Sequence, residues 1–299
     1  MRIGVVATLA RAWVVIRSHP RSGEHGYGSK FLTVWFFCWL FSSTASAQSM
    51  GPQNGTLLIV GGGRMGKEIV QEFVDRAGGI DAPFVLVPGA NAGEEWDDKY
   101  VAKSFLARAG AKDITVLHTR DRAVANSEEF TAPLRRAKGV WIDGGRQWRL
   151  ADSFLGTRTH CELFCVLSRG GVIGGSSAGA TIQGSYLVRG APEGNTVMMA
   201  KGHEFGFGFM SCTAIDQHVI ARKRENDLAE VIETYPGLLG IGIDEGTAIV
   251  VTGRRFRVIG SSQVVIHDRC LPVVDGRKYE LLSPGDEFDL CCRRKVAVK

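Results

Sequence analysis

A chain of 299 residues with 44% hydrophobic and 22% charged residues has the composition of a folded globular protein and is long enough for one large α/β domain. Its formal charge of +5 arises mostly near the N-terminus, because residues 1–47 contain five of the 36 lysines and arginines and one of the 31 acidic residues. The remaining 31 basic and 30 acidic residues leave a charge of +1 and no basic run. This balance argues against nucleic acid or an anionic membrane as a partner and favours a small substrate or a peptide.

The first 47 residues have the layout of a secretory signal. Lys30 precedes an 11-residue, largely apolar run, Phe31–Phe41, and the small residues that follow end in Ala45-Ser46-Ala47. This order predicts cleavage after Ala47 and a secreted or periplasmic protein. The run is shorter than the roughly 20 apolar residues that span a bilayer, so we expect no membrane contact once the signal is removed. The expected organisation is an N-terminal extension plus signal peptide at 1–47 and a single domain at 48–299.

From Thr56 onward the chain alternates short apolar runs with segments of helical spacing. Apolar strands separated by helices predict an α/β fold with a doubly wound, mostly parallel sheet that has helices on both faces. After about Ile241 the pattern becomes strand-rich, which predicts a C-terminal antiparallel β extension on the same sheet. The expected strands are Thr56–Val60, Phe84–Val87, Ile114–Leu117, Val140–Ile142, Val172–Ile173, Gly240–Thr252, Arg255–Ile259 and Ser262–Ile266, and the expected helices include Lys67–Arg76 and Lys99–Ala109.

A glycine-rich segment, Gly61-Gly62-Gly63-Arg64-Met65-Gly66, matches the G-x-G-x-x-G pattern of dinucleotide sites between a strand and a helix. Such a site also needs an acidic residue after the second strand for the ribose hydroxyls. Here Val87 is followed by Pro88-Gly89-Ala90-Asn91. We therefore interpret the glycines as a tight strand-to-helix turn, and we expect no nucleotide or other organic cofactor.

The cysteines do not predict a metal site or a disulfide framework. Six of the seven lie after the expected signal, where an exported chain permits disulfides. Cys161 and Cys165 share one helical face, Cys291 and Cys292 are adjacent, and neither pair has histidines at ligand spacing. We expect buried or unreactive thiols and no metal.

The segment Gly175-Ser176-Ser177-Ala178-Gly179 follows the apolar Val172-Ile173 and matches G-x-S-x-G. Small residues let the chain turn sharply between a strand and a helix, which exposes the hydroxyl of the central serine. The start of the following helix also offers N–H groups to a developing oxyanion. Ser177 is therefore the candidate nucleophile, and a glycine-rich turn without chemistry is the alternative.

A serine nucleophile needs a base and a carboxylate that orients the base. Among the five histidines after residue 47, His218 ends an expected strand in Asp216-Gln217-His218, at the same sheet edge as Ser177. His203, in a glycine-rich loop, is the alternative base. Asp244 and Glu245 both close an apolar run, and chemistry alone does not choose between them.

Three motifs together resemble the cyanophycinases, which are grouped with dipeptidase E among serine peptidases of glutamine-amidotransferase-like fold. The similarity runs from about Gly55 to Leu290 and includes Asp143-Gly144-Gly145-Arg146-Gln147. The three motifs are Gly174–Ala180, Asp216-Gln217-His218 with Arg222 and Arg224, and Gly240–Ala248.

The resemblance implies a triad of Ser177, His218 and Glu245, which favours Glu245 over Asp244. It implies an oxyanion hole formed by the Gly144–Gly145 turn and the amide of Ala178. It also implies substrate-binding residues, which are Gln147, Asp216, Gln217, Arg222 and Arg224.

The implied reaction is hydrolysis of an aspartyl-arginine polymer into β-aspartyl-arginine dipeptides, without a cofactor. Two positions depart from the pattern. Arg146 precedes Gln147 where the pattern has an acidic or amide residue, and Asp227 lies where the basic cluster continues to a third arginine. The alternatives are a peptidase for acidic or isoaspartyl peptides, similar to dipeptidase E, and a non-catalytic secreted binding protein. A homodimer stays open as the assembled form.

Overall fold

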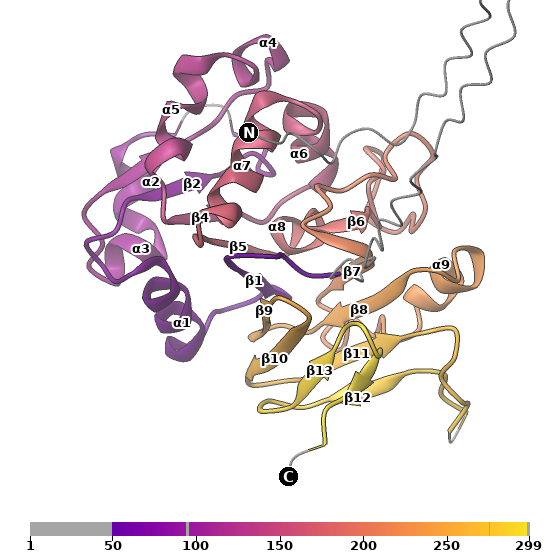
Figure 1. Cartoon of the computed structure of the whole chain (residues 1–299). Coiled ribbons are helices and arrows are strands. Elements are labelled where there is room, and N and C mark those ends of the chain that lie inside the picture. The colour runs from indigo at the N-terminus through magenta and orange to yellow at the C-terminus, as the bar shows by residue number, and fades with distance from the viewer. Residues whose placement is uncertain (1–49, 94–95, 275, 298–299) are drawn as a thin grey trace, which may run out of the picture. The chain divides into compact units, whose positions relative to one another are not determined.

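The computed structural model describes residues 50–93, 96–274 and 276–297, so the expected signal peptide and Cys38 lie outside the described residues. Within them, a nine-stranded sheet has the order β14-β13-β10-β9-β1-β5-β4-β2-β3 (Figure 1). Five neighbouring strands are parallel, and four antiparallel strands extend the β1 edge. The parallel strands are β1 (Thr56–Val60), β5 (Val172–Ser176), β4 (Gly139–Ile142), β2 (Phe84–Val87) and β3 (Ile114–Val116); the antiparallel ones are β9 (Thr247–Thr252), β10 (Arg255–Gly260), β13 (Glu287–Asp289) and β14 (Arg294–Lys295).

The central strands are apolar throughout because both faces of this sheet are buried. In β1, Leu57 and Ile59 belong to one hydrophobic cluster, whereas Leu58 and Val60 belong to another on the opposite face. Successive side chains of a strand point to opposite faces, so a strand buried on both sides has no polar position. This confirms the predicted α/β fold with a parallel sheet and a C-terminal antiparallel region.

Helices supply the outer layer on each face of the sheet. Residues of α1 and α3 pack with Leu58 and Val60, and residues of α4 to α8 pack with Leu57 and Ile59. The expected helix Lys99–Ala109 is divided at Ser104, whose hydroxyl accepts a hydrogen bond from the Ala107 N–H at 3.2 Å and caps the second helix. The helices are α1 (Lys67–Ala77), α2 (Asp98–Lys103), α3 (Phe105–Arg108), α4 (Arg122–Ala125), α5 (Glu128–Arg136), α6 (Gln147–Phe154), α7 (Arg158–Ser168), α8 (Ala178–Thr181) and α9 (Leu228–Thr234).

A second sheet of five strands, in the order β12-β11-β8-β7-β6, corrects one expectation. The run Gly240–Thr252 is not one strand, because Asp244-Glu245-Gly246 turns the chain out of β8 and into β9 of the other sheet. Gly246 adopts a φ of +64°, a conformation that favours glycine. The expected strand Ser262–Ile266 likewise joins the second sheet and not the first. The strands of this sheet are β6 (Gly184–Tyr186), β7 (Met210–Gln217), β8 (Leu239–Ile243), β11 (Val264–His267) and β12 (Glu280–Leu282).

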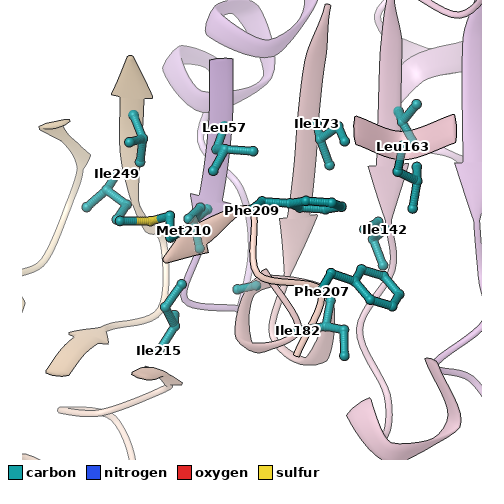
Figure 2. Packing of buried hydrophobic residues seen from close by; sticks show 14 of the residues in the cluster. Leu57, Ile142, Leu163, Ile173, Ile182, Phe207, Phe209, Met210, Ile215 and Ile249 are labelled. Atoms are coloured by element: carbon teal, nitrogen blue, oxygen red, sulfur yellow. The ribbon is translucent and has the colours of Figure 1, made fainter. Parts of the chain in front are cut away.

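The two sheets share one hydrophobic cluster. Figure 2 shows Phe209 and Met210, where the chain enters β7, among Leu57 of β1, Ile173 of β5 and Ile249 of β9. β7 and β8 are parallel, with Gln217 opposite Ile243. The residues that follow these two strands therefore emerge together at one edge.

The described cysteines are unpaired and exposed, so of the two expectations, buried or unreactive thiols, the buried one is wrong. Cys161 and Cys165 lie on the solvent side of α7, while Leu163, Val166 and Leu167 form its buried side. Among the described residues, no helix has the length and apolar character needed to cross a membrane.

Candidate active site

Ser177 occupies a sharp turn between β5 and α8, with φ 56° and ψ −112°. A non-glycine residue rarely adopts such a conformation, and here the surrounding packing holds it in place. A Cβ on Gly179 would lie 2.0 Å from the Ile142 carbonyl oxygen, and one on Gly175 would lie 2.3 Å from the Gly179 carbonyl oxygen. The small residues of G-x-S-x-G are therefore needed for the chain to turn at Ser177.

The three residues of the predicted triad form a continuous hydrogen-bonded line. The Ser177 Oγ lies 2.9 Å from the His218 Nε2, and the His218 Nδ1 lies 2.6 Å from the Glu245 Oε1. Burial lowers the pKa of His218, the hydrogen bond to Glu245 opposes that shift, and the charges of Arg222 and Arg224 lower the pKa further. The imidazole is therefore neutral at neutral pH, which is the form that accepts a proton.

The glycine run that resembles a dinucleotide motif packs against this line. A Cβ on Gly62, which has a φ of +118°, would lie 2.1 Å from the His218 Cε1, and one on Gly63 would lie 2.8 Å from the Glu245 Cβ. The His218 N–H donates to the Gly61 carbonyl at 2.9 Å, and the Gly246 N–H donates to the Gly62 carbonyl at 2.9 Å. The glycine run therefore leaves space for the imidazole and holds the backbone of His218 in place. The interpretation of the run as a tight turn, made from the sequence, did not include this role.

Asp244 and Glu245 have separate surroundings. The Asp244 carboxylate is buried and accepts hydrogen bonds from the N–H groups of Ile220 and Ala221 at 3.0 and 2.8 Å and from the Ser262 hydroxyl at 2.6 Å. It therefore shapes the loop after His218, and the neighbouring carboxylate is the one that meets the imidazole.

The residues expected to form an oxyanion hole do not all contact Ser177. A Cβ on Gly144 would lie 3.2 Å from the Ser177 Cβ, so Gly144 lies directly beside the serine. Ala178 follows Ser177 and is fully buried at the start of α8. A Cβ on Gly145 would instead meet the Ala90 carbonyl at 2.3 Å. Among the described residues, the N–H groups of Gly144 and Gly145 donate to no backbone carbonyl.

Two of the expected substrate-binding residues lie inside the protein. Gln147 is buried, and its Nε2 donates to the Val188 carbonyl at 2.9 Å. Asp216 has no exposed surface, and both of its carboxylate oxygens accept hydrogen bonds from Arg189. The described contacts therefore engage polar atoms of both side chains inside the protein, so their expected role in substrate binding stays a prediction.

The other three lie around His218. Gln217 is buried, and its Oε1 has no hydrogen-bond partner among the described residues. Arg222 is exposed, and Arg224 is half-buried with an Nη1 that likewise has no partner in the described part of the chain. Burial and the charge of Arg189 lower the pKa of Arg224. Unpaired buried polar atoms are uncommon, so the Gln217 Oε1 and the Arg224 Nη1 are candidates for contact with a bound molecule.

Arg189 is a central residue that sequence reasoning missed. Its guanidinium is 2% exposed and forms a bidentate pair with Asp216, with Nε–Oδ1 and Nη2–Oδ2 distances of 2.8 and 2.9 Å. Its Nη2 also donates to the Asp227 Oδ2 at 2.6 Å, and its Nη1 donates to the Asn195 carbonyl at 2.7 Å. Asp227, which departs from the motif's third arginine, is therefore a partner of a buried arginine.

Arg146, the other departure, is also engaged internally. Its Nη2 donates to the Ala191 carbonyl at 2.6 Å, close to the point where Gln147 binds the Val188 carbonyl. Both side chains therefore hold residues 188–191 against the turn that contains Gly144. In the described ranges no group of three or more His, Cys, Asp or Glu side chains is arranged to bind a metal.

Comparisons with known proteins identify the relatives of this chain. The model of peptidase family S51 matches residues 57–259. Cyanophycinase from Geminocystis herdmanii is 32% identical over 220 residues, which are 71% of this chain and 80% of that protein. Cyanophycinase from Synechococcus elongatus is 31% identical over 224 residues, 72% of this chain and 68% of that protein.

Two solved structures have a similar fold. A peptidase from an acI-B1 Actinobacterium has a TM-score of 0.60 at 22% identity, covering 80% of this chain and 98% of that one. A putative peptidase E protein from Listeria monocytogenes EGD-e has a TM-score of 0.50 at 17% identity, covering 70% and 99%.

The pairing of Arg189 predicts a strong and asymmetric effect on stability. Arg189→Leu should lower the free energy of unfolding by about 3–5 kcal/mol, because it leaves Asp216 buried without its cation. Asp227→Asn should cost less, because Asp227 is partly solvated and Arg189 keeps Asp216. Asp227→Arg should also destabilise the protein, since it places a second guanidinium beside Arg189. Guanidinium chloride unfolding measures all three.

The control for this effect is the double variant Arg189→Leu with Asp216→Asn. It removes the unpaired charge and should recover part of the loss. Equal small losses in Arg189→Leu and Asp227→Asn would contradict the assignment of Arg189 as the partner of a buried carboxylate.

Proposed function

The chain belongs to peptidase family S51, and from this premise we propose that it is a secreted hydrolase that cleaves aspartyl amide bonds with a Ser-His-Glu triad. Membership in this family makes it a serine-type peptidase. The observation that carries the proposal is the hydrogen-bonded line from Ser177 through His218 to Glu245. Secretion rests on the signal-like segment 1–47, and the N-terminal sequence of the exported protein tests it.

In the proposed mechanism, the Ser177 Oγ attacks the amide carbonyl while the His218 Nε2 takes its proton. Glu245 accepts the hydrogen bond from the Nδ1–H and stabilises the imidazolium that forms. The N–H groups of Gly144 and Ala178 donate to the oxyanion of the tetrahedral intermediate. His218 then returns the proton to the leaving amine, and water releases the acyl group by the same route.

The proposed substrate is an aspartyl-arginine polymer, cut to β-aspartyl-arginine dipeptides. The similarity to two proteins named cyanophycinase supports this choice. Arg222 and Arg224 supply positive charge beside His218, and the partnerless Nη1 of Arg224 and Oε1 of Gln217 are suited to the carboxylate and amide groups of such a chain. Gln147 and Asp216 act as positioning residues, through Val188 and Arg189.

We expect Ser177→Ala to abolish release of β-aspartyl-arginine from cyanophycin, with a loss on the order of 10⁴–10⁶ in rate, because the attacking oxygen is gone. Products are identified by mass, and a covalent serine probe should label the wild type at Ser177. An unchanged unfolding midpoint is the control for folding. Substantial residual activity in Ser177→Ala would refute the nucleophile, and hydrolysis of isoaspartyl dipeptides alone would refute the polymer.

Glu245→Gln should lower kcat far more than Asp244→Asn, approaching the roughly 10⁴-fold loss of a triad whose carboxylate becomes an amide. The amide cannot stabilise the imidazolium, whereas asparagine at 244 keeps an oxygen that accepts from the Ile220 and Ala221 N–H groups. Steady-state kinetics of the two variants makes the comparison. A larger loss in Asp244→Asn would show that the wrong carboxylate has been chosen.

Arg224→Gln should reduce kcat/KM on aspartyl substrates by about 10–150-fold, the equivalent of a charged hydrogen bond of about 1.5–3 kcal/mol. A neutral activated ester, which has no carboxylate to bind, should lose much less. Lys223→Gln is the matched control, because it removes the same charge from the adjacent exposed residue. Equal losses on ester and aspartyl substrate would indicate that Arg224 supports the fold.

A further inference from the structure

A cavity of about 360 Å³ opens beside Ser177, on the face of the main sheet that α1 and α3 cover. Gly144 and Ser176 line its edge next to the nucleophile, and Gly63 lines it next to Glu245. Its volume lies in the range of ligand pockets, and it adjoins the reacting atoms. None of the expected substrate-binding residues lines it.

The inner part of this cavity contains an acidic group without a cationic partner. Asp143 follows β4, is half-buried, and accepts a hydrogen bond from the Tyr100 hydroxyl. Within the described residues, no lysine, arginine or histidine lies within ion-pair distance of this carboxylate. Burial raises the pKa of Asp143, against hydrogen bonds from Tyr100 and Trp141 that lower it. A cation entering the cavity would therefore offset the cost of burying this charge.

The walls beside Asp143 are aromatic. The rings of Phe105 and Trp141 meet edge to face with centroids 4.6 Å apart, and Tyr100 completes the lining. A guanidinium stacks on aromatic faces and pairs with a carboxylate through two parallel N–H groups. A carboxylate in a cavity lined by aromatic side chains therefore suits an arginine side chain better than an acidic or a purely apolar one.

The outer part of the cavity has the opposite charge. Lys103 and Arg108 are exposed, and the Arg108 Nη1 donates to the Lys103 carbonyl at 2.9 Å. A second cavity of about 800 Å³ shares Arg108 and continues past Arg64 and Lys67. The two cavities therefore present an acid near Ser177 and bases further out, which matches a chain that carries both guanidinium and carboxylate groups.

We propose that Asp143 and Tyr100 form the base of a specificity pocket that binds the guanidinium of the substrate residue next to the bond that Ser177 attacks. The position of the pocket relative to the reaction rests on the proposed function. The preference for a guanidinium rests on the carboxylate and the aromatic walls, and binding measures it without any reaction.

The test is calorimetric titration of the purified protein with arginine amide and with citrulline amide, which has a similar shape and no charge. The wild type should bind arginine amide more tightly, and Asp143→Asn should weaken that binding by roughly 10–100-fold while citrulline amide is unaffected. Tyr100→Phe keeps the carboxylate and should keep the preference for arginine. Asp98→Asn, which removes an exposed charge of the neighbouring helix α2, should change neither affinity.

Equal affinities of the wild type for the two amides, or no detectable binding of arginine amide, would overturn the pocket. An Asp143→Asn variant that keeps its affinity for arginine amide would also overturn the pocket. So would a wild type that binds aspartate amide more tightly than arginine amide through Lys103 and Arg108. If Asp143→Asn does not fold, the affinities of the wild type and of Tyr100→Phe for the two amides still test whether the pocket prefers arginine. Failure to cleave aspartyl substrates together with a preference for arginine would refute the proposed function alone.

Discussion

The contact on which the site depends is that between the glycine loop after β1 and the ring of His218. Ser177 comes from β5 of one sheet, whereas His218 and Glu245 follow β7 and β8 of the other. Their alignment therefore requires the two sheets to meet within hydrogen-bond distance at one edge. Gly62 permits this, because any side chain there would occupy the space of the imidazole. Hydrogen bonds from the backbone N–H groups of His218 and Gly246 to carbonyls of this loop fix the distance between the two sheets.

The groups around His218 keep its imidazole neutral before the reaction and provide a carboxylate to stabilise the imidazolium that forms during it. Burial and the neighbouring arginines lower the pKa of His218, and Glu245 opposes them at the Nδ1. The Glu245 side chain is 41% exposed, so water solvates its carboxylate. A base of this kind accepts the proton of a serine and releases it readily.

The strands could be predicted from the sequence because a sheet buried on both faces leaves an apolar run wherever a strand passes. Ser177 and His218 could be predicted because each follows a strand, but the expectation that both lie at the edge of one sheet was wrong, because β5 and β7 belong to different sheets. The choice of Glu245 over Asp244 depends on which of two adjacent side chains points at the ring, and residue type does not specify that direction. Only resemblance to a family favoured Glu245.

What the sequence did not reveal depends on contacts between distant segments. Gly62 and His218 are far apart in the chain, so the glycine run looked like a local turn. Asp216 looked like a binding residue because it precedes a candidate base, but its partner Arg189 lies in an irregular loop without any pattern. The run Gly240–Thr252 looked like one strand because both of its halves are apolar, although they belong to different sheets.

The buried arginine also explains the acidic residue at position 227. Asp216 needs a cation because it is fully buried, and Arg189 supplies it from the loop between β6 and β7. Arg189 then has one N–H group of its Nη2 directed at Asp227, where a third arginine of the motif would repel it. An acidic residue at position 227 is therefore favourable beside Arg189, whereas an arginine there is not. Arg222 and Arg224 still supply positive charge near His218, and Asp143 lines the cavity that also reaches Gly144 and Ser176. A substrate with both carboxylates and guanidinium groups has a partner for the arginines and for Asp143. A purely acidic peptide has a partner for the arginines alone.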